Sequence, residues 1–192
     1  MDIIVSNLCK SYDGKAVLTD FNATFPAGKT TCLLGRSGCG KTTLLHILMG
    51  LVKADSGEIS GIPRKISAVF QENRLCTGLS VGRNAALACP GRLSPLEIIA
   101  HLEEVGLAGK ELLHRPIDTL SGGMQRRIAI IRAVLAEGDL LLLDEPFQGL
   151  DPRTRLQTMA YLQAHTRNKT LIMVTHSREE AELMGGSYIE MQ

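Results

Sequence analysis

Runs of apolar and β-branched residues mark the chain at residues 30–34, 140–143 and 170–174. Runs of this kind predict strands that are buried on both faces of a sheet. Two other segments, the helix expected from Thr42 and residues 124–135, have apolar residues spaced three and four positions apart, as in amphipathic helices. In the first, at 42–49, the expected buried face is Leu44, Ile47, Leu48 and Leu51. Strands that alternate with helices predict an α/β fold with a mainly parallel sheet and a ligand at the carboxyl ends of its strands.

The N-terminal part departs from this alternation. Residues 2–8 and 16–25 predict two antiparallel strands, and Asp13-Gly14 between them is a strong signal for a hairpin turn. Further short strands are expected at 58–60, 66–70 and 187–191. We therefore expect an N-terminal antiparallel β subdomain beside the parallel core.

Glycine and proline divide the middle of the chain into short helical pieces, which predicts an inserted helical subdomain. Its clearest helix begins at Ser94, which should form a capping box with Glu97. Other helices should begin at Ser121, at Asp151-Pro152 and at Ser177, where Glu180 would complete a second capping box. The predicted division is a single domain, 1–192, with its core in 1–71 and 121–192 and the helical subdomain in 72–120.

The composition is that of an ordinary globular domain, with 44% hydrophobic and 21% charged residues. Because the net charge is +1 and the basic residues are scattered, a nucleic-acid surface is not expected, and we interpret Arg126 and Arg127 as part of a solvated helix face. No apolar run approaches the roughly 20 residues of a membrane span, and no signal peptide opens the chain. We expect a cytosolic protein whose five cysteines are reduced thiols, since their spacing fits no metal site.

A complete G-x-x-x-x-G-K-[ST] motif follows the first buried strand, and it consists of Gly35, Arg36, Ser37, Gly38, Cys39, Gly40, Lys41, Thr42 and Thr43. A strand before it and a helix after it are the context of a phosphate-binding loop. Backbone N–H groups would contact phosphate oxygens, Lys41 would reach the outer phosphates, and Thr42 would hold Mg²⁺. The alternative is a plain glycine-rich turn, but a chance match to the whole pattern is expected in only about one percent of chains of this length.

Two acidic residues, Asp144 and Glu145, follow the all-leucine run at 140–143. An unpaired buried charge loses several kcal/mol of hydration, so a cation or a proton transfer would explain their position. Asp144 fits a Mg²⁺ partner, directly or through water, and Glu145 fits a general base for the water that attacks a γ-phosphate. Without the phosphate loop, a strand end capped by solvent would be the better interpretation.

Together these motifs resemble the nucleotide-binding subunit of an ABC transporter over nearly the whole chain. The segment Leu120-Ser121-Gly122-Gly123-Met124-Gln125 is similar to the signature motif that separates ABC ATPases from other P-loop enzymes, although Met124 stands where the family often has glutamine. The resemblance implies that Gln71 links the core to the helical subdomain, Gly149-Leu150-Asp151 forms the D-loop, His176 is the switch histidine, and Tyr12 stacks on adenine. Because 16 residues follow His176, we expect no regulatory domain.

The resemblance further implies a head-to-tail dimer with two ATP molecules. Each would lie between the phosphate loop of one chain and Ser121, Gly122 and Gly123 of the other, where a hydroxyl and two N–H groups at a helix N-terminus suit an anion. Catalysis would involve Lys41, Gln71, Glu145 and His176. Mg²⁺ would lie near Thr42, Gln71 and Asp144.

On this basis we expect the ATPase of a transporter, with import favoured, attached to the inner face of the cell membrane through a separate permease. The implied partners are a second copy or a homologous ATPase subunit, an integral membrane permease and a solute-binding protein, and no nucleic acid. A soluble ABC-type ATPase that acts on nucleic acid or the ribosome is an alternative, although such proteins usually carry a second ATPase half or a long coiled-coil insertion. The intact Lys41, Asp144, Glu145 and His176 argue against a non-catalytic nucleotide sensor.

Overall fold

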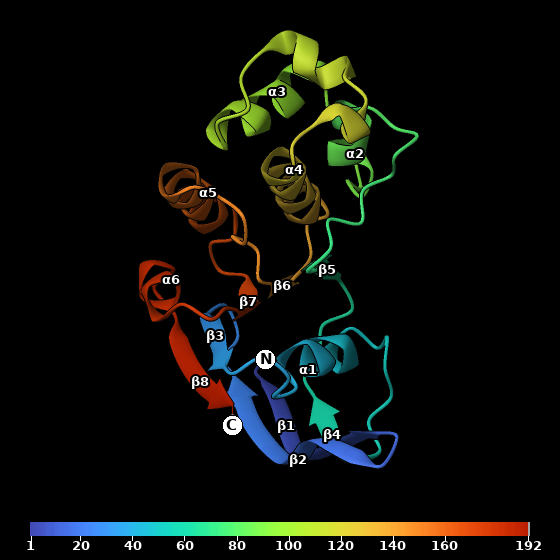
Figure 1. Ribbon diagram of the computed structural model, residues 1–192, viewed down its shortest axis with the longest axis vertical. Coiled ribbons are helices and arrows are strands. Elements are labelled where there is room, and N and C mark those ends of the chain that lie inside the picture. Colours follow the sequence, from blue (N-terminus) through green and yellow to red (C-terminus); the bar gives the residue numbers. More distant parts are fainter. Residues whose placement is uncertain (192) are drawn as a thin grey trace. The chain divides into compact units, whose positions relative to one another are not determined.

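The computed structural model describes residues 1–191, which form two compact units (Figure 1). The first unit contains residues 1–66, 139–145 and those from 168 on, and the second contains residues 67–138 and 146–167. Gln192, the last residue of the predicted domain, lies outside the described residues. The predicted division into a core and a subdomain at 72–120 remains a prediction.

A parallel sheet in the first unit has the strand order β6-β7-β3-β8. Its strands are β3 (Thr30–Gly35), β6 (Leu140–Asp144), β7 (Thr170–Val174) and β8 (Ser187–Met191). Every residue of β6 and β7 is buried, as the apolar runs at 140–143 and 171–174 predict. In register, Val174 pairs with both Leu33 and Asp144, so the carboxyl ends of β3, β6 and β7 meet at one edge.

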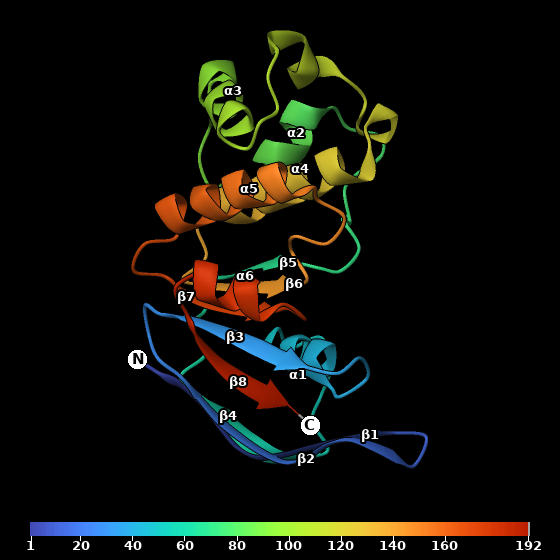
Figure 2. The ribbon, with the colours of Figure 1, turned by 60° about the vertical axis from the view of Figure 1, so that its left-hand side comes forward.

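An antiparallel sheet, β2-β1-β4, accompanies the parallel one in this unit (Figure 2). Its strands are β1 (Ile3–Tyr12), β2 (Lys15–Phe25) and β4 (Ser56–Ser60). Asp13 and Gly14 have positive φ values, 50° and 77°, as the predicted hairpin turn requires. The first strand continues past its predicted end because bulges interrupt the alternation of side chains while the backbone pairing with β2 continues.

Helix α1 (Lys41–Leu48) buries Leu44, Ile47 and Leu48 as predicted. The prediction that Leu51 shares this face is wrong, because its side chain is 57% exposed. Gly50 has a φ of 71°, a left-handed conformation that ends the helix before Leu51 is reached.

The second capping box, expected at α6 (Arg178–Leu183), forms only by half. The Ser177 hydroxyl accepts a hydrogen bond from the backbone N–H of Glu180. The carboxylate of Glu180 does not return to Ser177, because it accepts a hydrogen bond from the hydroxyl of Thr175. That threonine is 2% exposed, and the carboxylate provides its buried hydroxyl with a partner.

The second unit is mainly helical, and the chain enters it through β5 (Ile66–Val69). It contains α2 (Val81–Ala86), α3 (Pro95–Glu104), α4 (Gly122–Leu135) and α5 (Pro152–His165), with the 3₁₀ turns η1 (Lys110–His114) and η2 (Ile117–Thr119). The predicted capping box at Ser94 is present, and Ser121 and Asp151 cap α4 and α5. Among residues 1–191, no helix combines the length and the apolar character that crossing a membrane would require.

Candidate active site

The loop between β3 and α1 has the backbone of a phosphate-binding loop. Gly38 and Gly40 have φ values of 84° and 95°, in the left-handed region that glycine favours. A Cβ on Gly40 would lie 2.8 Å from the carbonyl oxygen of Val17, so a larger residue does not fit there. Gly40 is also the N-cap of α1 and has no side chain to cap it. The first N–H groups of the helix are therefore suited to bind an anion.

The ammonium group of Lys41 lies within this loop. Its Nζ donates hydrogen bonds of 2.8 Å to the carbonyl oxygens of Gly35 and Arg36. The residue is 4% exposed. A buried positive charge that is bonded to neutral carbonyls is a favourable partner for phosphate oxygens.

Thr42 contacts Asp144, 102 positions away in the sequence, through a hydrogen bond of 2.8 Å from its hydroxyl to Oδ2. Asp144 is 3% exposed, and this burial raises the pKa of its carboxyl group, against the opposing effect of the Thr42 hydrogen bond. A hydroxyl and a carboxylate are the hard oxygen donors that Mg²⁺ prefers. The two residues fit such an ion.

Glu145 and His176 form another close pair at the same edge of the sheet. Nε2 of His176 lies 2.6 Å from Oε1 of Glu145, and its Nδ1 lies 3.2 Å from the carbonyl oxygen of Gly35. Glu145 has a φ of 47°, which is uncommon for a residue other than glycine, and its N–H donates to the carbonyl of Val174. The backbone thus holds this carboxylate at the end of β6 in an unusual conformation.

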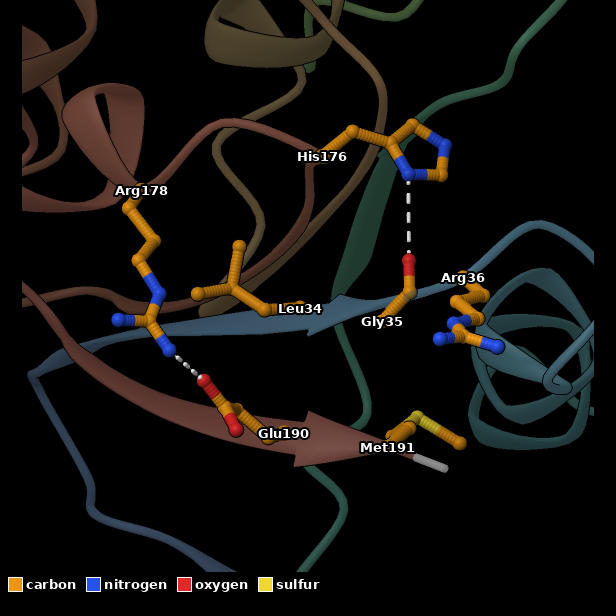
Figure 3. A pocket seen from close by; sticks show the side chains of 7 residues that line it. All are labelled: Leu34, Gly35, Arg36, His176, Arg178, Glu190 and Met191. Atoms are coloured by element: carbon orange, nitrogen blue, oxygen red, sulfur yellow. Dashed lines mark hydrogen bonds and ion pairs between the residues drawn. The ribbon is translucent and has the colours of Figure 1, made fainter.

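An open cavity of about 730 Å³ borders the same edge of the sheet (Figure 3). It is lined by Leu34, Gly35, Arg36, His176, Arg178, Glu190 and Met191. An ion pair between Arg178 and Glu190 lies along its β8 side. Sequence patterns gave no sign of this pair, because its two members come from different elements.

Tyr12 lies at the end of β1, in the first unit. The residue is 44% exposed, and Nζ of Lys10 lies 5.2 Å from the ring centroid. The exposed ring has a π surface on which a planar base can stack.

The other predicted site residues belong to the second unit. Ser121 accepts a hydrogen bond of 3.3 Å from the N–H of Met124, and Gly122 and Gly123 form the first turn of α4. Gly123 also faces the predicted D-loop, since a Cβ there would lie 3.4 Å from Cδ2 of Leu150. Gln71 is exposed, and its predicted role at the metal stays a prediction.

The prediction that Arg126 and Arg127 form a solvated helix face is wrong. Arg126 is 5% exposed, and its guanidinium donates to the carbonyl oxygens of Phe70, at 2.6 Å, and Gln71. Arg127 donates to the carbonyl of Val105 at 2.8 Å, and burial lowers its pKa. The available signal was the run 128–135, whose apolar residues surround the helix and leave it no fully solvated face.

Comparisons with known proteins bear on this site. The family model described as "ABC transporter" matches residues 18–148. The aliphatic sulfonates import ATP-binding protein SsuB 1 of Streptomyces avermitilis is 40% identical over 189 residues, which cover 97% of this chain and 72% of that protein. The taurine import ATP-binding protein TauB of Escherichia coli O157:H7 is 40% identical over 195 residues, which cover 94% of this chain and 75% of that protein.

Solved structures give the same picture for the fold. A dimeric, post-hydrolysis state of the ATP-binding cassette MJ0796 with ADP and Pi matches with a TM-score of 0.84 and 25% identity, over 99% of this chain and 94% of that one. A second dimeric structure of MJ0796, described as a bacterial ABC transporter cassette, matches with a TM-score of 0.84 and 27% identity. The match covers 98% of this chain and 94% of that one.

Proposed function

The chain belongs to the ABC transporter family, and from this premise we propose that it is the ATP-hydrolysing subunit of an importer that acts on a separate membrane permease. The observation that carries the proposal lies at one edge of the parallel sheet. There the phosphate loop with Lys41, the Thr42–Asp144 pair and the Glu145–His176 pair come together at the carboxyl ends of β3, β6 and β7.

ATP binding is assigned to the loop and to one aromatic ring. The N–H groups of the loop and of the start of α1 would bind the phosphates, and Lys41 would exchange its two carbonyl partners for phosphate oxygens. Tyr12 would stack on adenine. The loop residues assigned to the nucleotide are Gly35, Arg36, Ser37, Gly38, Cys39, Gly40, Lys41, Thr42 and Thr43.

Hydrolysis is assigned to the two close pairs. Thr42 and Asp144 would hold Mg²⁺, with Gln71 as a further ligand, and the bound ion would neutralise charge on the phosphates. Glu145 would take a proton from the attacking water, a role that typically contributes about 10²- to 10⁴-fold in rate. His176 would hold the carboxylate of Glu145 in place.

Assembly of the active form is assigned to the start of α4. Ser121, Gly122 and Gly123 are suited to bind the γ-phosphate of a nucleotide held by a second copy or by a homologous subunit. The similar MJ0796 cassettes are described as dimeric, which supports this arrangement. ATP would then close the dimer and hydrolysis would reopen it.

Our proposal for the direction of transport and for the solute class rests on the relatives. Those reported above are import proteins for aliphatic sulfonates and for taurine, and both solutes are small organic sulfonates. We assign this chain to import of the same class, on the cytoplasmic face of the membrane, with the permease and an external solute-binding protein as its partners. The solute itself would contact those partners.

Co-purification tests this assignment. The tagged Glu145→Gln chain is isolated from detergent-solubilised membranes with Mg-ATP, and its companions are identified by mass spectrometry. We expect an integral permease, and sulfonate uptake that stops when the gene for this chain is deleted. Recovery of ribosomal proteins or RNA in place of a permease would support the alternative function.

The shared-site dimer has its own test. Glu145→Gln should accumulate as a dimer in Mg-ATP, measured by size-exclusion chromatography with light scattering, with the co-purified permease present if the isolated chain stays monomeric. Adding Ser121→Arg should abolish that dimer, because the bulky side chain occupies the place of the partner's γ-phosphate. ATP binding to the chain's own loop should persist. Ser121→Arg is also made alone, with Glu145 intact, and ATP hydrolysis at the wild-type rate in that variant would refute the shared site.

A further inference from the structure

A cluster of three potential metal ligands lies in the second unit, between α3 and α5. It consists of His101, Glu104 and His165, whose ligand atoms all lie within 4.8 Å of one another. His101 and Glu104 are three positions apart on α3, so they share one face of the helix, and His165 is the last residue of α5. None of the three has a place in the nucleotide site assigned above.

The donor atoms need little movement to surround an ion. Nε2 of His165 already lies 2.7 Å from Oε2 of Glu104. Zinc bonds of 2.0–2.1 Å in a tetrahedral site place donor atoms about 3.3 Å apart, so no pair has to close by more than about 1.5 Å. The side chains of His165 and Glu104 are 29% and 45% exposed, and they have room for such a change of rotamer.

The third candidate ligand, His101, has a hydrogen-bond partner that can orient its ring, as histidine ligands of metal sites commonly do. Nδ1 of His101 lies 3.0 Å from the hydroxyl of Tyr161, a residue that is 2% exposed. With Nδ1 in this hydrogen bond, Nε2 is the His101 atom that would bind the ion. Histidine ligands commonly donate their second N–H to an oxygen that fixes the ring, and the tyrosine oxygen can accept in this way.

We propose that His101, Glu104 and His165 bind one divalent transition-metal ion, such as Zn²⁺, and so join α3 to α5. Two imidazoles and one carboxylate are a set that zinc and its neighbours prefer, whereas Mg²⁺ and Ca²⁺ prefer oxygen ligands alone. Because the cluster is half exposed, water would occupy the fourth position. The inference concerns the second unit and is independent of the transported solute.

Zinc binding to the full chain provides the test. Equilibrium dialysis against Zn²⁺, with the bound metal measured by mass spectrometry, should give one ion that the Glu104→Gln variant binds at least about tenfold more weakly. Glutamine at this exposed position keeps a hydrogen-bond partner for His165, so the fold is retained. Zinc should raise the melting temperature of the wild-type chain and should have a smaller effect on Glu104→Gln.

Other metal ligands in the chain require matched controls. Glu103→Gln changes the neighbouring exposed carboxylate, and His114→Gln changes an exposed histidine of the same unit. Both should bind zinc like the wild type. With Co²⁺ as the probe, the near-ultraviolet spectrum should lack the sulfur charge-transfer band of a cysteine site.

Three results would overturn the proposal. They are the absence of bound zinc in the wild type at a molar excess of the metal, unchanged binding when Glu104→Gln and His165→Gln are combined, and a cobalt spectrum with a thiolate band.

Discussion

Nε2 of His176 lies 2.6 Å from Oε1 of Glu145. The other ring nitrogen lies 3.2 Å from the carbonyl oxygen of Gly35, so the imidazole connects the carboxylate to the phosphate loop. Both partners accept hydrogen bonds. The ring therefore satisfies both when its two nitrogens are protonated, or when Glu145 supplies the second proton.

Glu145→Gln should slow ATP hydrolysis by about 10²- to 10⁴-fold, because an amide cannot serve as a general base. ATP affinity should change little, since the phosphates are assigned to the loop and to Lys41. Single-turnover hydrolysis and equilibrium nucleotide binding measure the two effects. A variant that hydrolyses ATP at the wild-type rate would remove Glu145 from the mechanism.

His176→Ala should lower the hydrolysis rate by about 10²-fold with little effect on ATP affinity, because the carboxylate loses the group that holds it. If the histidine acts through Glu145, the double variant should be no slower than Glu145→Gln alone. The same single-turnover assay decides this, with His114→Ala as a control. Additive losses would show that His176 acts on the nucleotide independently.

Lys41→Ala should abolish tight ATP binding. A hydrogen bond to a charged group contributes about 1.5–3 kcal/mol, so the loss should be at least about tenfold in Kd. Isothermal titration calorimetry measures it. The exposed Lys53 is the matched control, and equal affinities of Lys41→Ala and Lys53→Ala would contradict the phosphate-loop assignment.

Tyr12→Ala should weaken ATP binding by about 1–3 kcal/mol, the scale of a base stacked on an aromatic ring. Tyr12→Phe keeps the ring and should have nearly the wild-type affinity. Nucleotide titrations of both variants provide the measurement. Equal losses would indicate that the hydroxyl, and not the π surface, is what matters.

Asp144→Asn should raise the melting temperature at neutral pH without Mg²⁺ and should impair hydrolysis. Burial raises the pKa of Asp144, so the folded chain binds its proton more tightly than the unfolded chain does. The stability that the protonated Asp144 contributes to the folded state is therefore lost as the pH rises from the ordinary aspartate pKa of about 3.8 through the raised pKa of the folded chain. Asparagine removes this loss and still accepts from Thr42.

Calorimetric melting over a range of pH values checks this prediction. The difference between Asp144→Asn and the wild type should vanish at low pH, where the carboxyl group is protonated in both states. The exposed Asp139 provides the control, and Asp139→Asn should not reproduce the gain. A wild-type melting temperature above that of Asp144→Asn at neutral pH would contradict the prediction.

The parts of the fold that could be predicted from the sequence depend on local stereochemistry. The hairpin at Asp13-Gly14 and the caps at Ser94, Ser121 and Asp151 each need only a few consecutive residues. The meeting of Thr42 with Asp144 was also foreseeable, because parallel strands bring their carboxyl ends to the same edge of a sheet.

The wrong predictions have two causes. In some cases a side chain bonds to a partner that local sequence patterns do not identify, and in one case the backbone leaves the helical conformation earlier than the apolar spacing predicts. Arg126 donates a hydrogen bond to the carbonyl of Gln71, which is 55 positions away in the sequence. No periodicity of the sequence indicates a contact over that distance. The carboxylate of Glu180 accepts a hydrogen bond from the buried hydroxyl of Thr175 and not from the backbone of the N-cap residue, Ser177. Leu51 fitted the helical spacing, but the left-handed Gly50 had already turned the chain.

The anchoring of Arg126 has a mechanical consequence. Its planar guanidinium is bonded to two successive backbone carbonyls, those of Phe70 and Gln71, while its own backbone lies in the second turn of the helix that Ser121 begins. When the N-terminal end of α4 moves, the backbone at Phe70 and Gln71 is therefore expected to move with it. This coupling uses backbone carbonyls, so it does not depend on the side chain at position 71. Lysine at position 126 could not replace it, because a single ammonium on a flexible stem lacks the rigid fork that grips both carbonyls at once.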